Sequence, residues 1–493
     1  MKIVTAGFRR AVTTAITASL LLTGSVPAAS APPPSSAVQP NSVPPALPPG
    51  TQPPRDTGGP DVPYTPTGKG CVESGTKNEL IEYMPWGQVH LNLQQAHRFA
   101  TGKGVKIAII DTGVDPRNPR FGDRVVPSGE YVSGNRNGAD DCDGHGTEVA
   151  GVAAAARTEG DFVGAAPEAT ILAIRQTSDR FEFQGDATRV KRTSAGKVST
   201  LAQAVVRAAD QGAGVVNISL TNCGTPKDFS ADDRALQAAI RYAVDVKNTV
   251  IVTAAGNLDS KAGCPLQNNN LDPATVNSVS SPAWFADDVL SVASMARSGE
   301  VSGFSVWGPW VSIAAPGEEI ISVDPKGTGL TNVNVKADGV GKIQGTSFAA
   351  PYVAGITALV RERFPDLKAR QVMDRLKATA LHPGNTTGRD HRIGFGMVNP
   401  VAALTAVLPA ESTGFSSPPT RDLVTTVTAP PDRDWPPIIV ALSGISIGFG
   451  LLMLTLLVLN SINRGRRAEL GAQVAPRRTS ATPKTRGVPP SPM

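Results

Sequence analysis

The stretch VKIAIIDTGVD, residues 105–115, joins an apolar, β-branched run to an acid at its end. Such a run is typical of a strand buried on both faces of a sheet. Asp111 follows the run directly, and Gly113 permits a turn. Alone, an acid before Thr-Gly most often makes a turn, so the meaning of Asp111 depends on the rest of the chain.

Similar runs recur along the chain and alternate with helical patterns. The further runs expected as strands are Thr170–Ile174, Val215–Leu220, Thr249–Thr253 and Val289–Ala293. The segments expected as helices are Glu148–Ala156, Leu201–Gln211 and Asp232–Val246. This alternation predicts an α/β fold of three layers, with a mostly parallel central sheet and helices on both faces. In such sheets the functional residues usually lie at the carboxyl ends of the strands.

The stretch ADDCDGHGTEVAG, residues 139–151, crowds acids and a cysteine around His145. A regular calcium loop fails, because with Gly144 as its sixth residue the first and twelfth are alanines. A zinc helix fails, because Glu148 stands where a second histidine is needed. A catalytic base therefore remains as the main interpretation, and Thr147 is expected to cap the following helix. An irregular calcium site stays as a minority alternative for three acids: Asp140, Asp141 and Asp143.

Two further loops carry polar side chains where an expected strand ends or an expected helix begins. Asn257 follows the strand expected at 249–253, where it either makes a turn or donates to an oxyanion. Ser347 lies in GTSFAAPYVAG, residues 345–355, and opens a helix expected to reach Arg363. We expect Pro351 near the start of that helix, where a missing N–H costs least. Ser347 alone would be read as an ordinary helix cap.

Together, an acid, a histidine, an amide and a serine at one edge of a parallel sheet predict acyl transfer. A serine becomes a strong nucleophile when a base takes its proton, and an acid must orient that base. The tetrahedral oxyanion needs donors such as the Asn257 side chain and the Ser347 backbone N–H. The chain order Asp111, His145, Ser347 is the subtilisin order.

The flanking segments predict an exported, membrane-anchored protein. Residues 31–66 hold 13 prolines and no hydrophobic pattern, so they cannot build a core. Residues 438–459 contain no charged side chain and are long enough to span a bilayer as a helix. The expected organisation is a signal peptide (1–30), a Pro-rich extension (31–66), a peptidase domain (67–408), a Pro/Ser/Thr-rich linker (409–437), a transmembrane helix (438–459) and a basic tail (460–493).

The charge distribution supports this topology. The formal net charge of the chain is +5, and the positive charge is concentrated in the arginine-rich tail. The net charge therefore does not indicate nucleic-acid binding. Arginines directly after the apolar segment predict a cytoplasmic tail and an extracytoplasmic peptidase domain, under the positive-inside rule. Four cysteines in an exported chain predict two disulfides, whose connectivity the count leaves open.

The chain resembles the subtilisin-like serine proteases in six ordered stretches: TGKGVKIAIIDTG, GHGTEVAG, VGAAPEATI, VVNISL, TAAGN and GTSFAAPYVAG. The resemblance covers about residues 98–404. It implies a triad of Asp111, His145 and Ser347, an oxyanion hole with Asn257, a protein substrate, and neither cofactor nor metal. The flanks further resemble the mycosins, which implies association with a type VII secretion membrane complex. A mainly structural role in that complex, with dispensable proteolysis, is the alternative function.

The chain departs from ordinary subtilisins in several places. No folded prodomain is visible, and the mycosin resemblance implies an extension that wraps the domain. Glu148 replaces a usual histidine and is expected to be non-catalytic, pointing away from the triad or lining a helix face. SLTNC, residues 219–223, replaces a glycine beside the cleft, which predicts restricted specificity.

The resemblance also bears on the disulfides and the inserted loops. Cys223 and Cys264 are expected after neighbouring strands and therefore to pair, leaving Cys71 with Cys142, in agreement with the mycosin pattern. Two long polar insertions, 176–198 and 258–282, are expected to be partner surfaces, with lids or disorder as alternatives.

Overall fold

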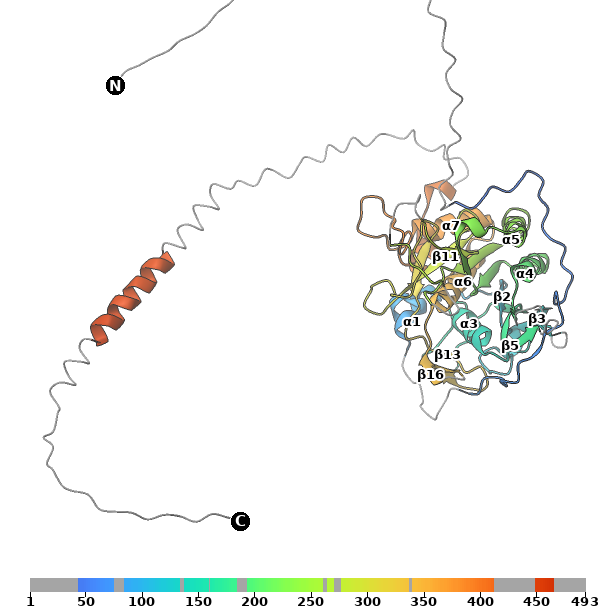
Figure 1. Ribbon diagram of the computed structural model, residues 1–493, viewed down its shortest axis with the longest axis horizontal. Coiled ribbons are helices and arrows are strands. Elements are labelled where there is room, and N and C mark those ends of the chain that lie inside the picture. The colour runs from blue at the N-terminus through green and yellow to red at the C-terminus, as the bar shows by residue number, and fades with distance from the viewer. Residues whose placement is uncertain are drawn as a thin grey trace, which may run out of the picture. The chain divides into compact units, whose positions relative to one another are not determined.

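The computed structural model describes most of the chain, which clusters into two units, residues 1–413 and 414–493 (Figure 1). The described residues are 43–74, 84–133, 137–158, 160–183, 193–259, 264–269, 276–336, 339–411 and 448–464. The expected signal peptide lies outside them.

A seven-stranded sheet forms the centre of the first unit, and every neighbouring pair of its strands is parallel. In spatial order the strands are β12 (Ile313–Pro316), β11 (Leu290–Met295), β9 (Val250–Ala254), β7 (Val215–Ile218), β2 (Lys106–Asp111), β4 (Thr170–Arg175) and β3 (Val125–Glu130). The prediction of a mostly parallel sheet is confirmed. All five predicted strands are present, while β3 and β12 were not predicted.

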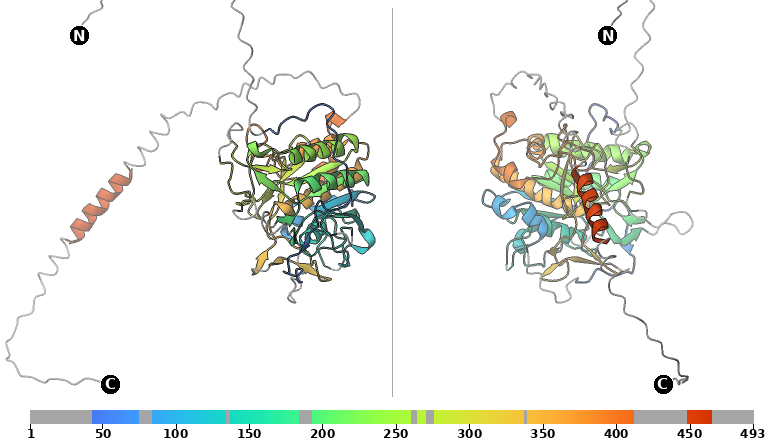
Figure 2. Two further views of the ribbon diagram at one scale, coloured as in Figure 1. Left: turned by 45° about the vertical axis from the view of Figure 1, so that its right-hand side comes forward. Right: turned by 90° about the vertical axis from the view of Figure 1, so that its left-hand side faces the viewer.

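Helices cover both faces of this sheet (Figures 1 and 2). Helices α3 and α6 pack against each other on one face, and α4 and α5 pack against each other on the other. The helices are α1 (Trp86–His90), α2 (Leu93–Ala96), α3 (His145–Ala154), α4 (Val198–Asp210), α5 (Ala231–Arg241), which continues as a π-helical turn (Tyr242–Val246), α6 (Thr346–Arg363), α7 (Ala369–Ala378) and α8 (Pro400–Thr405).

Small antiparallel pairs surround the central sheet. They are β1 (Thr65–Pro66) with β5 (Ser178–Phe183), β5 with β6 (Thr193–Ala195), β8 (Asn222–Gly224) with β10 (Val279–Ser281), β13 (Ser322–Val323) with β14 (Leu330–Thr331), and β15 (Val333–Lys336) with β16 (Gly339–Lys342). Both inserted loops therefore contribute strands, at β5, β6 and β10.

The described part of the Pro-rich extension lies against the surface of the α/β fold. Asp56 Oδ2 is 2.8 Å from Arg207 Nε, and Asp61 Oδ2 is 2.6 Å from Lys197 Nζ. Strand β1 then adds to β5, and Tyr64 packs with Val132 and Ala195 in a small apolar cluster. The extension thus has no core of its own and packs against the surface of α4 and β5.

In the second unit, residues 448–464 form a helix with exposed apolar side chains. Across the described ranges, no helix is both long and apolar enough to cross a membrane. Residues 438–447 of the expected transmembrane segment, and the tail beyond 464, lie outside those ranges.

Candidate active site

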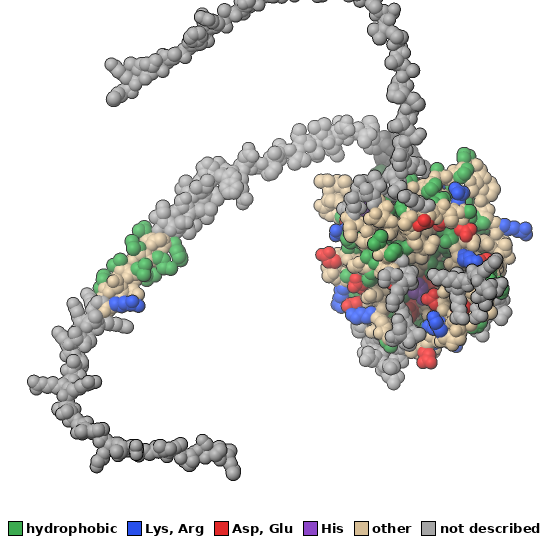
Figure 3. All heavy atoms as spheres, in the orientation of Figure 1, with side chains coloured by type: hydrophobic (Ala, Val, Ile, Leu, Met, Phe, Trp, Pro, Cys, Tyr) green, Lys and Arg blue, Asp and Glu red, His purple; other side chains and the backbone are tan. Residues whose placement is uncertain are grey.

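Asp111 and His145 meet where β2 ends and α3 begins. His145 Nδ1 lies 2.7 Å from Asp111 Oδ1, and Asp111 is fully buried while the His145 side chain is 28% exposed. Because a carboxylate accepts hydrogen bonds, this contact places the ring proton on Nδ1 and leaves Nε2 as the basic nitrogen. Figure 3 shows a histidine side chain set in a hollow, with acidic side chains beside it.

The two segments approach so closely that only glycine fits beside His145. A Cβ on Gly146 would lie 2.1 Å from the carbonyl oxygen of Gly113. Thr112 strengthens the junction: its N–H donates to Asp111 Oδ1 at 2.7 Å, and its Oγ1 accepts from the Gly146 N–H at 2.8 Å. The acid and the base are therefore held by backbone packing as well as by their own contact.

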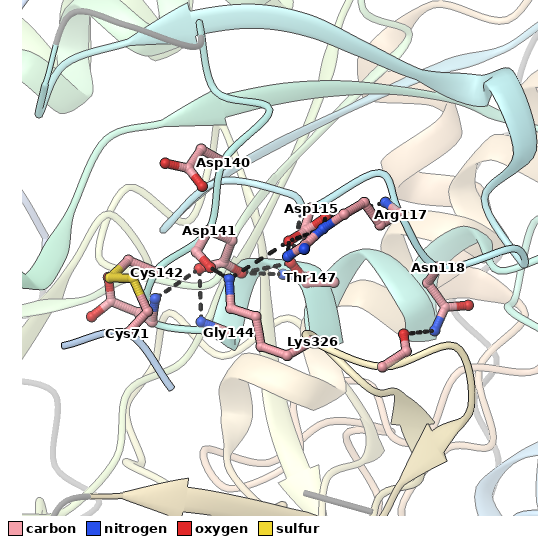
Figure 4. Close-up of polar contacts among 12 residues, drawn as sticks. Cys71, Asp115, Arg117, Asn118, Asp140, Asp141, Cys142, Gly144, Thr147 and Lys326 are labelled. Carbon is pink, nitrogen blue, oxygen red and sulfur yellow. Dashed lines mark hydrogen bonds and ion pairs between the residues drawn. A yellow bond between two sulfur atoms is a disulfide. The ribbon is translucent and has the colours of Figure 1, made fainter. Parts of the chain in front are cut away.

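The carboxylate of Asp141 organises the loop before His145 (Figure 4). Its Oδ1 accepts from the N–H of Gly144 at 2.7 Å and from Thr112 Oγ1 at 2.9 Å. Its Oδ2 accepts from both the N–H and the hydroxyl of Thr147, at 2.8 and 2.7 Å. Asp141 therefore satisfies donors at the N-terminus of α3, which a helix leaves unpaired. The expectation that Thr147 is the cap was wrong, because the helix begins two residues earlier, at His145.

Asp141 is itself deeply buried and tied to a second loop. Burial raises the pKa of its carboxyl to about 6, against the opposing effect of the Thr147 donors. Lys326 Nζ donates to the Asp141 carbonyl at 2.5 Å and lies 3.6 Å from Asp115 Oδ2. Asn118 fastens the same loop by donating to the carbonyl of Gly329 at 3.0 Å (Figure 4).

The other two acids of this stretch also have protein partners. Asp143 accepts from Ser178 Oγ at 2.5 Å and from the Asp179 N–H at 3.0 Å, while Asp140 Oδ2 lies 3.7 Å from Arg175 Nη1. No group of three or more potential metal-ligating side chains occurs within the described residues. Turn and loop contacts therefore account for the acids that first suggested a calcium site.

Ser347 is the second residue of α6 and is paired with Ser219, directly after β7. Its Oγ donates to the Ser219 carbonyl at 3.1 Å, and Ser219 Oγ donates to the Ser347 carbonyl at 2.7 Å. Pro351 explains the second bond, because it lies inside the helix and has no N–H for the carbonyl four residues earlier. The expectation that Pro351 sits where its N–H is not needed was therefore wrong.

The side-chain oxygen of Asn257 accepts hydrogen bonds from Thr346, and its amide nitrogen is left to donate. Its Oδ1 accepts from the N–H and hydroxyl of Thr346, at 2.9 and 3.0 Å. A Cβ on Gly345 would lie 3.5 Å from Asn257 Nδ2 and 3.7 Å from the backbone nitrogen of Ser347. Both nitrogen atoms thus lie close to Gly345, whose φ of 147° and ψ of 160° are nearly confined to glycine. Such a pair can stabilise an oxyanion.

The imidazole of His145 has an aromatic and an anionic neighbour. Its ring packs edge-on against Phe348, the residue after Ser347, with centroids 5.2 Å apart. Burial lowers the pKa of His145, but the charge and hydrogen bond of Asp111 outweigh that effect and raise the pKa to about 9. The packing brings the starts of α3 and α6 together, so His145 contacts the residue that follows Ser347.

Several residues of this site were not found from the sequence. Thr112, Ser219 and Phe348 gave no signal beyond their position next to predicted residues. Glu148 lies on α3 and is 3% exposed. The sequence left open whether it points away from the triad or lines a helix face, and the structure places it on a buried face of α3.

Both disulfides join the pairs expected from the sequence. Cys71 is bonded to Cys142 and Cys223 to Cys264, with Cα–Cα distances of 4.4 and 5.1 Å. The Val72 N–H donates to the Cys142 carbonyl at 2.9 Å, so the extension is attached three residues before His145.

Comparison with known proteins identifies the class to which this site belongs. The subtilase family profile matches residues 102–396, which is more than half of the chain. The chain therefore belongs to the subtilase family and is a subtilisin-like serine endopeptidase. Within that family it is a mycosin. It is 42% identical to Mycosin-1 of Mycobacterium tuberculosis over 74% of this chain and 83% of the relative, and 44% identical to Mycosin-4 of the same organism over 74% and 79%.

Solved structures agree with this assignment. A structure of the MycP3 protease from the type VII (ESX-3) secretion system matches with a TM-score of 0.67 and 40% identity, covering 74% of this chain and all of that chain. A chain in the structure of an intact ESX-5 inner membrane complex matches with a TM-score of 0.68 and 36% identity, covering 85% and 99%.

Proposed function

We propose that this mycosin hydrolyses peptide bonds through an acyl-enzyme on Ser347. His145 Nε2 takes the hydroxyl proton, Asp111 orients the imidazole, and Asn257 Nδ2 with the Ser347 N–H receives the oxyanion. The 2.7 Å contact between His145 and Asp111 is the observation that carries this proposal. The Ser347 hydroxyl, which donates to Ser219, turns about its Cα–Cβ bond to reach the base.

Labelling with a fluorophosphonate probe tests this mechanism directly. In that reaction Ser347 Oγ bonds to phosphorus, fluoride leaves, and His145 accepts the hydroxyl proton. We expect the full chain to be labelled at Ser347, and Ser347→Ala and His145→Ala to lose the label while remaining folded. A folded wild-type chain that takes no label at Ser347 would overturn the proposed triad.

We further propose that the cleft accepts a restricted set of substrates. The segment after Ser219 is held by antiparallel pairing of β8 with β10 and by the disulfide Cys223–Cys264. A cleft wall held in this way moves little to admit bulky substrates. This rigidity favours cleavage at a few sites over general degradation. A library of unrelated folded and unfolded proteins should be cleaved at few positions; extensive digestion of all of them would contradict the proposal.

The chain is proposed to act from a membrane-anchored position within a type VII secretion complex. Support comes from the uncharged segment 438–459, the arginines after it, and the solved relatives from such systems. The proposed order is a signal peptide, the extension, an extracytoplasmic peptidase domain to residue 408, the linker, one membrane helix and a cytoplasmic tail. Extraction of the full chain by detergent but not by alkaline carbonate is expected, and release by carbonate would contradict the anchor.

A structural role in the complex is the second candidate function. It is favoured by the ESX-5 inner membrane complex that contains a similar chain. Complementation of a deletion strain separates the two candidates. Ser347→Ala restores secretion if the role is structural and fails to restore it if peptide hydrolysis is required.

A further inference from the structure

Glu148 is a buried acid on the helix that His145 begins. It lies three residues after His145, so the two side chains share one face of α3. The residue is 3% exposed. A buried carboxyl group is costly unless it is hydrogen-bonded or neutral, so its contacts require an explanation.

The Glu148 side chain contacts a hairpin that leads toward Ser347. With its amide nitrogen turned toward the acid, Asn334 donates to both Oε1 and Oε2 at 2.7 Å. Asn334 lies on β15, and its partner strand β16 ends at Lys342, shortly before Ser347. One contact therefore joins the helix of the histidine to the segment that carries the serine.

The surrounding packing keeps Glu148 in place. Ser322 Oγ donates to the Glu148 carbonyl at 2.5 Å. One turn further along α3, a Cβ on Gly151 would lie 2.3 Å from the same Ser322 Oγ. The helix thus packs directly on β13, and its Glu148 face is fixed against this neighbouring strand.

We propose that Glu148 is a positioning residue: through Asn334 it fastens the hairpin β15–β16 to the helix of His145 and so sets the serine segment against the base. This inference rests on the proposed triad and adds a residue that contacts neither substrate nor the reacting atoms.

The charge around Glu148 favours its neutral form. Burial raises the pKa of its carboxyl well above its usual value, and the acids Asp141, Asp324 and Asp111 act in the same direction against His145. A neutral carboxyl group is closely imitated by glutamine, whereas aspartate lacks the reach to Asn334. Glu148→Gln should therefore keep the contact near neutral pH, and Glu148→Asp should lose it.

The rate of fluorophosphonate labelling of the full chain tests the proposal without a known substrate. At pH 7 we expect Glu148→Gln to label within about twofold of wild type, and Glu148→Asp, Glu148→Ala and Asn334→Ala to label about tenfold more slowly. The double variant Glu148→Ala/Asn334→Ala should be no slower than either single variant, because both remove one contact. Glu168→Gln, at an exposed position, is the matched surface control.

The pH profile separates positioning from an effect of charge. Because a neutral carboxyl group places no charge beside His145, Glu148→Gln should leave the pH at which the labelling rate rises unchanged. The proposal is overturned if Glu148→Ala labels like wild type, if Glu148→Gln is as slow as Glu148→Ala, if the two alanine effects multiply, or if the Gln profile moves. A wild-type chain that never labels Ser347 instead overturns the proposed triad, so the two failures are distinct.

Discussion

Ser219 and Ser347 exchange hydrogen bonds, each hydroxyl donating to the carbonyl oxygen of the other residue. The exchange joins the carboxyl end of β7 to the first turn of α6. Asn217 adds a donor from its Nδ2 to Ser219 Oγ at 2.9 Å. Because Pro351 offers no N–H to the Ser347 carbonyl, Ser219 replaces a helix bond and simultaneously holds the proposed nucleophile.

Replacing Ser219 tests that relationship. Ser219→Ala leaves the Ser347 carbonyl without its donor, and an unsatisfied buried group costs about 1–3 kcal/mol. We expect a loss of that size in the free energy of unfolding, measured by urea denaturation, together with slower labelling of Ser347. Ser291→Ala is the matched control, because Ser291 is buried in β11 and its Oγ has no hydrogen-bond partner in the described structure. An equal loss in both variants would contradict the assigned role.

The protonation of His145 sets the direction of the pH dependence. Only the neutral imidazole can take the Ser347 proton, and the pKa of His145 is raised to about 9. The labelling rate should therefore rise with pH from 6 toward 9, by about tenfold per unit well below the pKa. Measurement across pH 6 to 10 checks this, and a rate that is flat above pH 7 would show that His145 is already neutral there.

Asp141 should matter for stability more than its distance from the reacting atoms suggests. Asp141→Asn replaces one acceptor oxygen by an NH₂ group, which faces either the Thr147 donors or those of Gly144 and Thr112. We expect about 2–3 kcal/mol loss in the free energy of unfolding, by analogy with lost caps and unsatisfied buried donors. Asp123→Asn, at an exposed position, should change it by less than about 0.5 kcal/mol. Similar values for both would remove Asp141 from its capping role.

The two disulfides should contribute about equally to the free energy of unfolding, but only Cys71–Cys142 should hold the extension in place. Their sequence separations of 71 and 41 residues predict losses of about 4 kcal/mol each when both cysteines of a pair become serine. Only Cys71→Ser/Cys142→Ser should speed hydrogen exchange at Val72, whose N–H donates to Cys142. Equal exchange at Val72 in both double variants would show that the bond does not hold the extension.

The parallel sheet was readable from the sequence because buried strands are local apolar runs. Strand β3 was missed for a physical reason: it contains Pro127 and Gly129, which an edge strand tolerates and a central strand does not. The strand expected at Val215–Leu220 stops at Ile218, where Ser219 leaves the sheet to meet α6.

The site was predictable where function requires a particular side chain after a strand, as at Asp111. It was not predictable where a role depends on a partner distant in sequence. Asp141 acts through Thr112 and Thr147, and Ser219 through Ser347, so their roles exist only in the folded chain. The contacts of Glu148 could not be predicted, because they come from β13 and β15, which no local pattern places against α3.

The bond between Cys71 and Cys142 makes a covalent ring of the chain that contains Asp111. A single nick anywhere from residue 72 to 141 therefore opens the ring and releases no fragment. The proposed acid and base would remain within one molecule, and a gel would show two pieces only after reduction. Under oxidising conditions, a single cleavage inside this ring leaves the proposed site covalently whole.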